Sequence, residues 1–316
     1  MTASAAAQVS FLGIFAADLS FRAERLPRIG ETLLGSDFAI GAGGKGSNQA
    51  VACARSGGHV ALLTRIGRDV FGELALRTWR QAGIDTVGVE LSDEPTGAAF
   101  IFVDEANGQN AIIVNPGAAR RIDRSFVDRA ARLIAASRVF ATQLEQPVAA
   151  ALRGLEIARG AGATTVFNPA PAPAAAMPEA IWRLCDVVVP NEVEASMLTG
   201  VDVDGPEGAA AAADVLIAKG AGNVIVTLGG QGALLRTPTA RLHIPAVDAG
   251  VLRDTTGAGD AFIGGLCTAI AEGRSLADAV GFASAVAGLS VTRPGTAASM
   301  PARAEVDRLL GASDRR

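Results

Sequence analysis

Short apolar segments alternate with helical segments through the middle of the chain, and this pattern constrains the fold more than any other feature. The expected strands are 138–144, 163–167, 186–189 and 222–228, and the expected helices between and around them are 123–136, 147–160, 192–199 and 206–219. Buried strands joined by helices form a mostly parallel sheet with helices on both faces. Beyond them we expect a hairpin (231–236 and 240–246), a helix beginning near Gly257 and an alanine-rich helix from about 275. The chain, 1–316, is therefore expected to form a single α/β domain.

The first third of the chain has a different pattern. After a first strand at 9–15, strand-like segments at 32–40, 86–91, 98–104 and 111–114 follow without helices between some of them. Asn107-Gly108 predicts a hairpin between the last two, because both residues tolerate positive φ. We expect these four strands to form a small separate sheet over the carboxyl edge of the main sheet, where open α/β folds bind ligands.

Composition excludes several classes of partner. The 28 basic and 32 acidic residues give a net charge of -4, and with 4% aromatic residues there is neither a basic surface nor a stacking platform for nucleic acid. Cys53, Cys185 and Cys267 show no CxxC spacing, which argues against disulfides and zinc and fits a reducing cytoplasm. Segment 1–17 lacks the basic start of a signal peptide, and the uncharged stretch 160–178 contains four prolines. We expect a cytoplasmic protein that binds a small molecule, with no membrane span.

A glycine-rich loop at 41–50 leads into a helical segment. Its glycines let the backbone approach a ligand closely, while Lys45 and Asn48 supply a cation and a two-way hydrogen-bonding amide. Lysine is unexpected here, because only two of the 28 basic residues are lysines. The loop matches GxGxxG, but Arg65 lies near the place where a dinucleotide-binding fold needs an acid, and the glycine spacing is too short for a Walker A loop. Alone, it is either a ligand-binding loop or a flexible turn with a solvated charge.

A second glycine motif, 254–262, stands at the expected helix start near Gly257. Backbone N–H groups at such a start point at an anion, and the helix dipole adds to the attraction. Asp260, in the first turn, is placed to accept a proton from an attacking hydroxyl while these amides stabilise a transferring phosphoryl group. The alternative is an ordinary acidic residue in a first helical turn.

Two further motifs follow strands. Asn191 and Glu194, three apart at a helix start, are suited to order Mg²⁺-bound water or phosphate oxygens, or else they form only a capping box. Segment 226–232 is a strand ending in a glycine turn, which by itself indicates a hairpin connection.

Taken together in this order, the motifs resemble the ribokinase family of sugar kinases, also called the PfkB family, from about residue 8 to 310. Segments 13–18, 143–145, 168–172 and 291–295 add to the resemblance. It implies a Rossmann-like α/β domain and a β-sheet lid, formed by about 19–40 and 86–116, that also makes a homodimer interface. It further implies transfer of the ATP γ-phosphoryl group to a sugar CH₂OH, ribose first among the candidates to give ribose 5-phosphate, with Mg²⁺ and an activating K⁺.

The resemblance also assigns roles to individual residues. It implies Asp260 as the catalytic base, with Gly257, Ala258 and Gly259 as a backbone anion hole. The implied sugar-binding residues are Asp18, Gly44, Lys45, Asn48, Glu145 and Asp260. Those implied near the nucleotide and its Mg²⁺ are Asn191, Glu194, Thr227, Gly229, Gly232 and, near the adenine, Ser284. The implied K⁺ loop contains Asp254, Thr256, Ser290, Arg293, Gly295 and Ser299.

The chain departs from the family pattern at Ala16, where these sugar kinases usually have asparagine two residues before Asp18. A hydrogen bond to a sugar hydroxyl is then missing, so 2-deoxyribose, a ketose, ketodeoxygluconate or a nucleoside stays open as the acceptor. Two alternatives from other classes are a catalytically silent sugar-binding regulator, which would be expected to lose the base or the anion hole, and an NAD-dependent dehydrogenase, which rests on the GxGxxG match alone.

Overall fold

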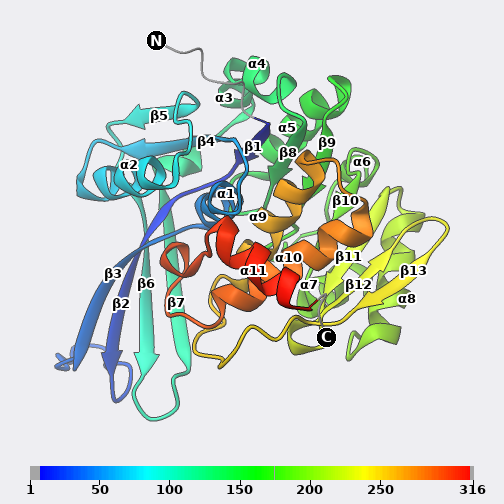
Figure 1. The fold of residues 1–316 in the computed structure, drawn as a ribbon. Helices are drawn as coiled ribbons and strands as arrows, with labels where there is room; N and C mark the ends of the chain where they lie inside the picture. The colour runs from blue at the N-terminus through cyan, green and yellow to red at the C-terminus, as the bar shows by residue number, and fades with distance from the viewer. Residues whose placement is uncertain (1–7, 174, 314–316) are drawn as a thin grey trace.

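A nine-stranded, mostly parallel sheet runs through the computed structural model, which describes residues 8–173 and 175–313 (Figure 1). From one edge to the other its strands are β13 (Arg241–Ile244), β12 (Ala233–Arg236), β11 (Asn223–Thr227), β10 (Val187–Val188), β9 (Thr164–Phe167), β8 (Val139–Thr142), β1 (Val9–Leu12), β4 (Val60–Gly67) and β5 (Val89–Ser92). Neighbours from β11 to β5 pair in parallel, while β12 and β13 are antiparallel. The predicted α/β class and the C-terminal hairpin are confirmed. The predicted domain, 1–316, extends at both ends beyond the described residues.

Helices cover both faces of this sheet, and each face has its own hydrophobic core. One face carries α1 (Lys45–Arg55), α2 (Val70–Ala82), α9 (Ala258–Ala271), α10 (Leu276–Ser290) and α11 (Arg303–Ser313). The other carries α3 (Arg124–Arg129), α4 (Ala131–Ala135), α5 (Val148–Gly160), α6 (Ala180–Arg183), α7 (Glu192–Thr199) and α8 (Pro206–Ala218). The expected helix 123–136 is present but divides at Ala130 into α3 and α4. Within the described residues, none of these helices is long and apolar enough to cross a bilayer.

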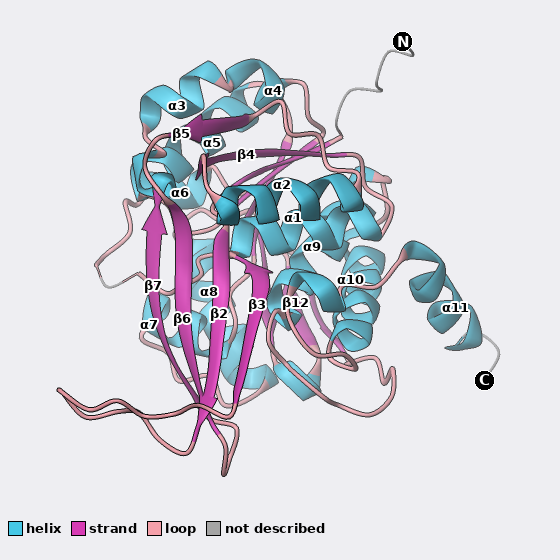
Figure 2. Ribbon diagram, turned by 90° about the vertical axis from the view of Figure 1, so that its left-hand side faces the viewer, coloured by secondary structure: helices cyan, strands magenta, loops and turns pink. Residues whose placement is uncertain are grey.

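A second, four-stranded sheet projects from one side of the molecule (Figure 2). Its order is β3 (Asp37–Gly43), β2 (Ala16–Ala23), β6 (Thr96–Asp104) and β7 (Asn110–Gly117). The hairpin expected at Asn107-Gly108 joins β6 to β7, with Gly108 at φ +72°. The first strand ends at Leu12 rather than at residue 15, and after three residues the chain enters β2 in the small sheet.

The expectation that 86–91 belongs to the small sheet is wrong. This segment contributes β5 to the main sheet, where Val89 pairs with Thr64 of β4. Strand β4 extends four residues beyond its pairing with β1, and helix α2 provides the crossover that a parallel neighbour requires. The fourth strand of the small sheet is β2, and the expected strand at 32–40 begins only at Asp37.

The start of α1 lies against the end of β1 at a distance that only glycine allows. A Cβ placed on Gly13 would stand 2.7 Å from the Cα of Gly46. The same turn of α1 is anchored to α2, because Nε1 of Trp79 donates a hydrogen bond to Oγ of Ser47 at 2.9 Å. The Trp79 ring also meets Phe15 edge-on, with 5.6 Å between centroids. These contacts fix the glycine loop at the junction of the two sheets.

Candidate active site

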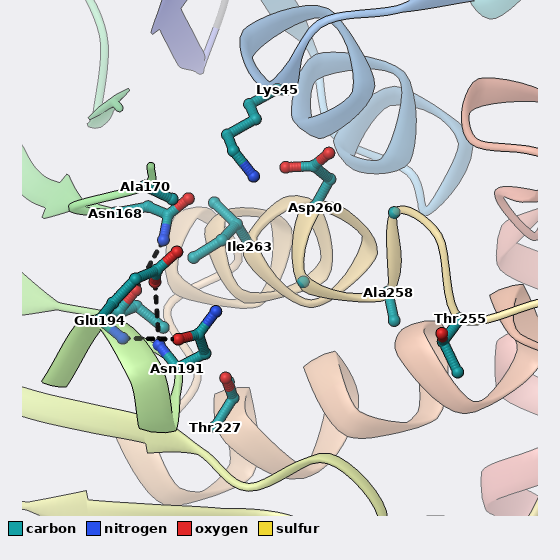
Figure 3. A pocket seen from close by; sticks show the side chains of 13 residues that line it. Lys45, Asn168, Ala170, Asn191, Glu194, Thr227, Thr255, Ala258, Asp260 and Ile263 are labelled. Carbon is teal, nitrogen blue, oxygen red and sulfur yellow. Dashed lines mark hydrogen bonds between the residues drawn. The ribbon is translucent and has the colours of Figure 1, made fainter. Parts of the chain in front are cut away.

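A pocket lies at the carboxyl ends of β9, β10 and β11, facing the N-terminus of α9 and the start of α1 (Figure 3). It is lined by Lys45, Asn168, Ala170, Val189, Asn191, Glu194, Thr227, Thr255, Gly257, Ala258, Gly259, Asp260 and Ile263. Residues expected from three separate motifs, the glycine loop, the 190–194 segment and the 254–262 segment, therefore meet in one cavity. This is the edge at which open α/β sheets bind ligands.

Asp260 is held at this site by amides of α1. Its Oδ2 accepts a hydrogen bond from Nδ2 of Asn48 at 3.1 Å, and its Oδ1 accepts one from Nε2 of Gln49 at 3.0 Å. The Lys45 side chain extends toward the same carboxylate (Figure 3). The charge of Asp260 is the main cause that raises the pKa of Lys45, so this ammonium stays protonated.

Two further predicted residues, Asp18 and Glu145, add acidic groups around Lys45. The Glu145 carboxylate accepts a hydrogen bond from the backbone N–H of Lys45 at 2.7 Å. Burial raises the pKa of Glu145 to about 7, with the Lys45 charge opposing that rise. The Asp18 carboxylate packs directly against Gly43, because a Cβ built on Gly43 would stand 2.3 Å from Oδ1 of Asp18. Burial raises the pKa of Asp18 to about 6. The loop thus brings one cation and three carboxylates together.

The first turn of α9 leaves backbone donors free. Gly257 caps the helix at φ +79°, and the N–H of Ala258 donates to the carbonyl of Thr255 at 3.1 Å. The N–H groups of Gly259 and Asp260 have no acceptor among the described residues. A Cβ built on Gly259 would meet nothing within 4 Å. Of the amides in this turn, those of Gly259 and Asp260 are available to an anion, whereas that of Ala258 is already bonded.

Asn191 and Glu194 form a capping box, one of the two roles that their three-residue spacing predicts. Oδ1 of Asn191 accepts from the N–H of Glu194 at 2.8 Å, and Oε2 of Glu194 accepts from the N–H of Asn191 at 3.0 Å. Both also line the pocket, beside Thr227 (Figure 3). Burial raises the pKa of Glu194. The cap leaves one carboxylate oxygen for a ligand, and such a donor set fits a largely hydrated magnesium ion.

Three other residues predicted near the nucleotide, Gly229, Gly232 and Ser284, and the predicted sugar-binding residue Gly44 do not line this pocket. Gly229 and Gly232 belong to the turn between β11 and β12, at φ +51° and +93°. Ser284 is buried in α10. Gly44 is the N-cap residue of α1 at φ +85°, where a Cβ would stand 2.7 Å from the carbonyl oxygen of Ile14.

The residues of the expected K⁺ loop lie beside the start of α9. Asp254 ties two segments together, because its Oδ1 accepts from the N–H of Thr256 at 2.9 Å and its Oδ2 from the N–H of Gly295 at 2.8 Å. The hydroxyls of Ser290 and Ser299 donate to carbonyls at 2.8 Å. The Arg293 guanidinium is paired with Glu305, so its charge is compensated. Carbonyl, hydroxyl and carboxylate oxygens form a donor set that fits a hard cation.

Several residues at the site carried no role in the sequence prediction. Asn168, Ala170, Val189, Thr255 and Ile263 line the pocket, and Gln49 and Gln143 lie behind it. Asn168 directly follows β9, and a polar residue after a buried parallel strand is a signal that sequence analysis can use. Gln49 carries no comparable signal, because only the helix phase of α1 shows that it faces Asp260.

Comparison with known proteins gives consistent matches over nearly the whole chain. The family model described as pfkB family carbohydrate kinase matches residues 6–303. A ribokinase of Haemophilus influenzae is 37% identical over 96% of this chain and 98% of its own length. A deoxyribokinase of Salmonella typhi is 36% identical over 97% of this chain and 99% of its own. The structure of a ribokinase of Arabidopsis thaliana complexed with ribose and ATP superposes with a TM-score of 0.92 at 29% identity, covering 97% of this chain and 99% of that one.

Proposed function

The chain belongs to the pfkB family of carbohydrate kinases, and on this premise we propose that it transfers the γ-phosphoryl group of ATP to the CH₂OH group of ribose, giving ribose 5-phosphate. The observation that carries the proposal is the environment of Asp260. The side-chain amides of Asn48 and Gln49 fix its carboxylate beside Lys45. In the same turn of α9, the backbone N–H groups of Gly259 and Asp260 have no acceptor among the described residues. The ribokinases of Haemophilus influenzae and Arabidopsis thaliana support ribose and ATP as the substrate pair. A silent regulator is disfavoured, because both the base and the free amides are present.

In the proposed reaction, the oxygen of the sugar CH₂OH group forms a bond to the γ-phosphorus as the bond between that phosphorus and the bridging oxygen of ADP breaks, and ADP leaves. Asp260 takes up the proton that the hydroxyl loses. The free amides of Gly259 and Asp260, at the positive end of α9, stabilise the charge on the transferring group. Lys45 offsets the negative charges of the surrounding carboxylates. Glu194 would hold a magnesium ion, which when bound would offset negative charge on the nucleotide.

Sugar recognition is assigned to Asp18, Gly44, Lys45, Asn48 and Glu145. Asn48 is 3% exposed, and within the described residues its Oδ1 has no hydrogen-bond partner. A buried acceptor of this kind is costly unless a ligand satisfies it. A sugar hydroxyl donating to Asn48 would complete the network around Asp260.

We further propose K⁺ as an activator bound by the oxygens of the loop that Asp254 ties together, beside the anion-binding turn. We place the enzyme in the cytoplasm, which the free, buried state of Cys53, Cys185 and Cys267 supports.

The function is tested by coupled measurement of ADP release over pentoses, 2-deoxyribose, hexoses and nucleosides, each in KCl and in tetramethylammonium chloride at equal ionic strength. We expect turnover that depends on sugar, is highest with ribose or 2-deoxyribose, and falls when K⁺ is replaced. Sugar-independent or absent turnover would contradict the kinase proposal, and equal rates in both salts would contradict the K⁺ proposal.

Sugar selectivity is expected to depend on position 16. Ala16 is buried in β2 two residues before Asp18, so both side chains lie on the same face of the strand. An amide at this position would be left unpaired by a sugar lacking its hydroxyl, whereas alanine leaves nothing unpaired. The preference for ribose over 2-deoxyribose in kcat/KM is therefore expected to rise about threefold to tenfold in Ala16→Asn. An unchanged preference profile would show that position 16 does not face the sugar. Alanine at this position and the similarity to a deoxyribokinase make 2-deoxyribose the second candidate substrate.

The outer face of the small sheet is proposed as a homodimer interface. Phe21, Phe38, Ile40 and Ile113 lie on one face of the sheet by register, and each is at least 40% exposed. A sheet face of this kind is an aggregation hazard unless a partner covers it. We expect a dimer by light scattering, and Ile113→Lys is expected to weaken it at least tenfold, because a charge would be buried at the interface. Val70 is equally exposed, at 70%, but lies on α2, so Val70→Lys is the matched control. A wild-type monomer at all concentrations would contradict the proposal.

A further inference from the structure

A buried chain of amides lies behind the catalytic carboxylate. Nε2 of Gln49 donates to Oδ1 of Asp260 at 3.0 Å and to Oδ1 of Asn168 at 3.1 Å. The oxygen of the same amide accepts a hydrogen bond from Nε2 of Gln143. Gln49 and Gln143 are fully buried. Every polar atom of the Gln49 amide is therefore used, and its orientation is fixed by three different partners.

These partners come from separate elements of the fold. Gln143 follows β8, and Asn168 follows β9 and is itself anchored by donating from Nδ2 to the carbonyl of Val189 after β10 at 2.8 Å. Asp260 lies in α9 on the same face of the sheet as α1. The side chain of Gln49 thus connects the carboxyl ends of three sheet strands to a single carboxylate.

We propose that Gln49 is a positioning residue for catalysis, which holds the Asp260 carboxylate in the orientation that receives the hydroxyl proton. The inference rests on the proposed kinase function. Asn48 holds the other oxygen of Asp260, but its amide borders the sugar side and has a free acceptor. Gln49 has no free polar atom with which to bind substrate, so its contribution is to orientation.

Loss of this bond is expected to affect turnover rather than binding. The carboxylate becomes able to turn away from the attacking hydroxyl, which lowers kcat, while the groups that bind sugar and ATP keep their places. The charged groups that face Asp260 from the surrounding elements are Lys45 of α1, Asp18 of β2, Glu145 after β8 and Glu194 of α7. They are unchanged in a Gln49 variant.

The test is Gln49→Met, which keeps the length of the side chain and removes the amide. We expect kcat to fall about 10- to 100-fold with KM for sugar and ATP within about threefold of wild type. Gln146→Met is the matched control, because Gln146 is a buried glutamine whose Nε2 bonds Thr142 and the Gln143 carbonyl but not Asp260. Gln143→Met, which frees the Gln49 amide to rotate while leaving its donors in place, is expected to give a smaller fall in kcat, again with KM within about threefold of wild type.

The outcomes separate the two proposals. If the wild type turns over and kcat of Gln49→Met is no lower than that of Gln146→Met, the positioning role alone is overturned. A rise in KM in place of the fall in kcat would overturn it as well. Wild-type protein without sugar-dependent turnover would overturn the proposed function and, with it, this inference. If Gln49→Met does not fold, an unchanged kcat in Gln143→Met would overturn the inference.

Discussion

Replacing Asp260 by asparagine is expected to lower kcat about 10²- to 10⁴-fold while sugar and ATP still bind. Asparagine keeps the shape of the side chain but cannot take the hydroxyl proton. Its new NH₂ group would face a donor, yet the Asn48 amide has a free oxygen and can turn to present it. The fold and the nucleotide site should therefore persist, and the other sugar-binding residues, Asp18, Gly44, Lys45 and Glu145, are unchanged. Steady-state kinetics together with calorimetric titration of sugar and nucleotide separates turnover from binding.

A closely matched control exists in the next helix. Asp278 occupies the same third position of α10 that Asp260 occupies in α9, so both carboxylates have the same relation to a helix dipole. Asp278→Asn is expected to leave kcat unchanged, because among the residues that the structure describes its carboxylate bonds only Ser275, the cap of its own helix. Near-wild-type kcat in Asp260→Asn would remove the base assignment.

Replacing Lys45 by methionine is expected to lower kcat/KM about 100-fold, because the ammonium is the cation that faces Asp260 inside the pocket. The variant should also change how stability depends on pH. In the wild type, the pKa of Glu145 is about 7 in the folded protein and near 4.5 in the unfolded chain. At pH values between the two, folding therefore takes up a proton. This group therefore makes the folded state less stable as pH rises through that window.

Removing the Lys45 charge removes a cause that lowers the pKa of Glu145, so the window extends to higher pH. The deficit in Tm of Lys45→Met relative to wild type should accordingly grow between pH 6 and pH 8.5, by roughly a few degrees. Thermal unfolding across this range gives the measurement. Lys219→Met, at the exposed end of α8, replaces the only other lysine of the chain and should show no such trend. A pH-independent deficit would show that Lys45 and Glu145 are not coupled.

The sequence predicted the α/β layers where strand and helix patterns were long and regular. The elements from 138 to 228 lie within a few residues of their expected bounds, because each strand is buried and each helix has an apolar face. The error at 86–91 has a different cause. A four-residue edge strand has too few residues to show a clear hydrophobic pattern. Which of the two sheets β5 joins depends on the unpaired edge of β4 and on the crossover through α2.

The sequence indicated those pocket residues that stand in a recognisable motif at a helix start or a strand end. It did not indicate residues that reach the pocket only through the packing of one helix on another. Lys45, Asn191 and Asp260 stand in glycine-rich or strand-terminal motifs, and they meet in one pocket. Gln49 lies one residue beyond Asn48 and became visible only when α1 and α9 were seen to pack together. The bonded amide of Ala258 could not be foreseen either, because it depends on the turn at Thr255.

The bond between Trp79 and Ser47 gives the protein a built-in optical probe. Ser47 lies between Lys45 and Asn48 in the first turn of α1, so binding of the proposed sugar to these two residues is expected to disturb the polar partner of the Trp79 indole. The chain has one other tryptophan, Trp182, which packs on Phe167 in the core of the opposite face of the sheet. Intrinsic fluorescence from the two indoles is therefore expected to have one component that responds to ligand and one that serves as an internal reference, which would make sugar occupancy measurable without any turnover.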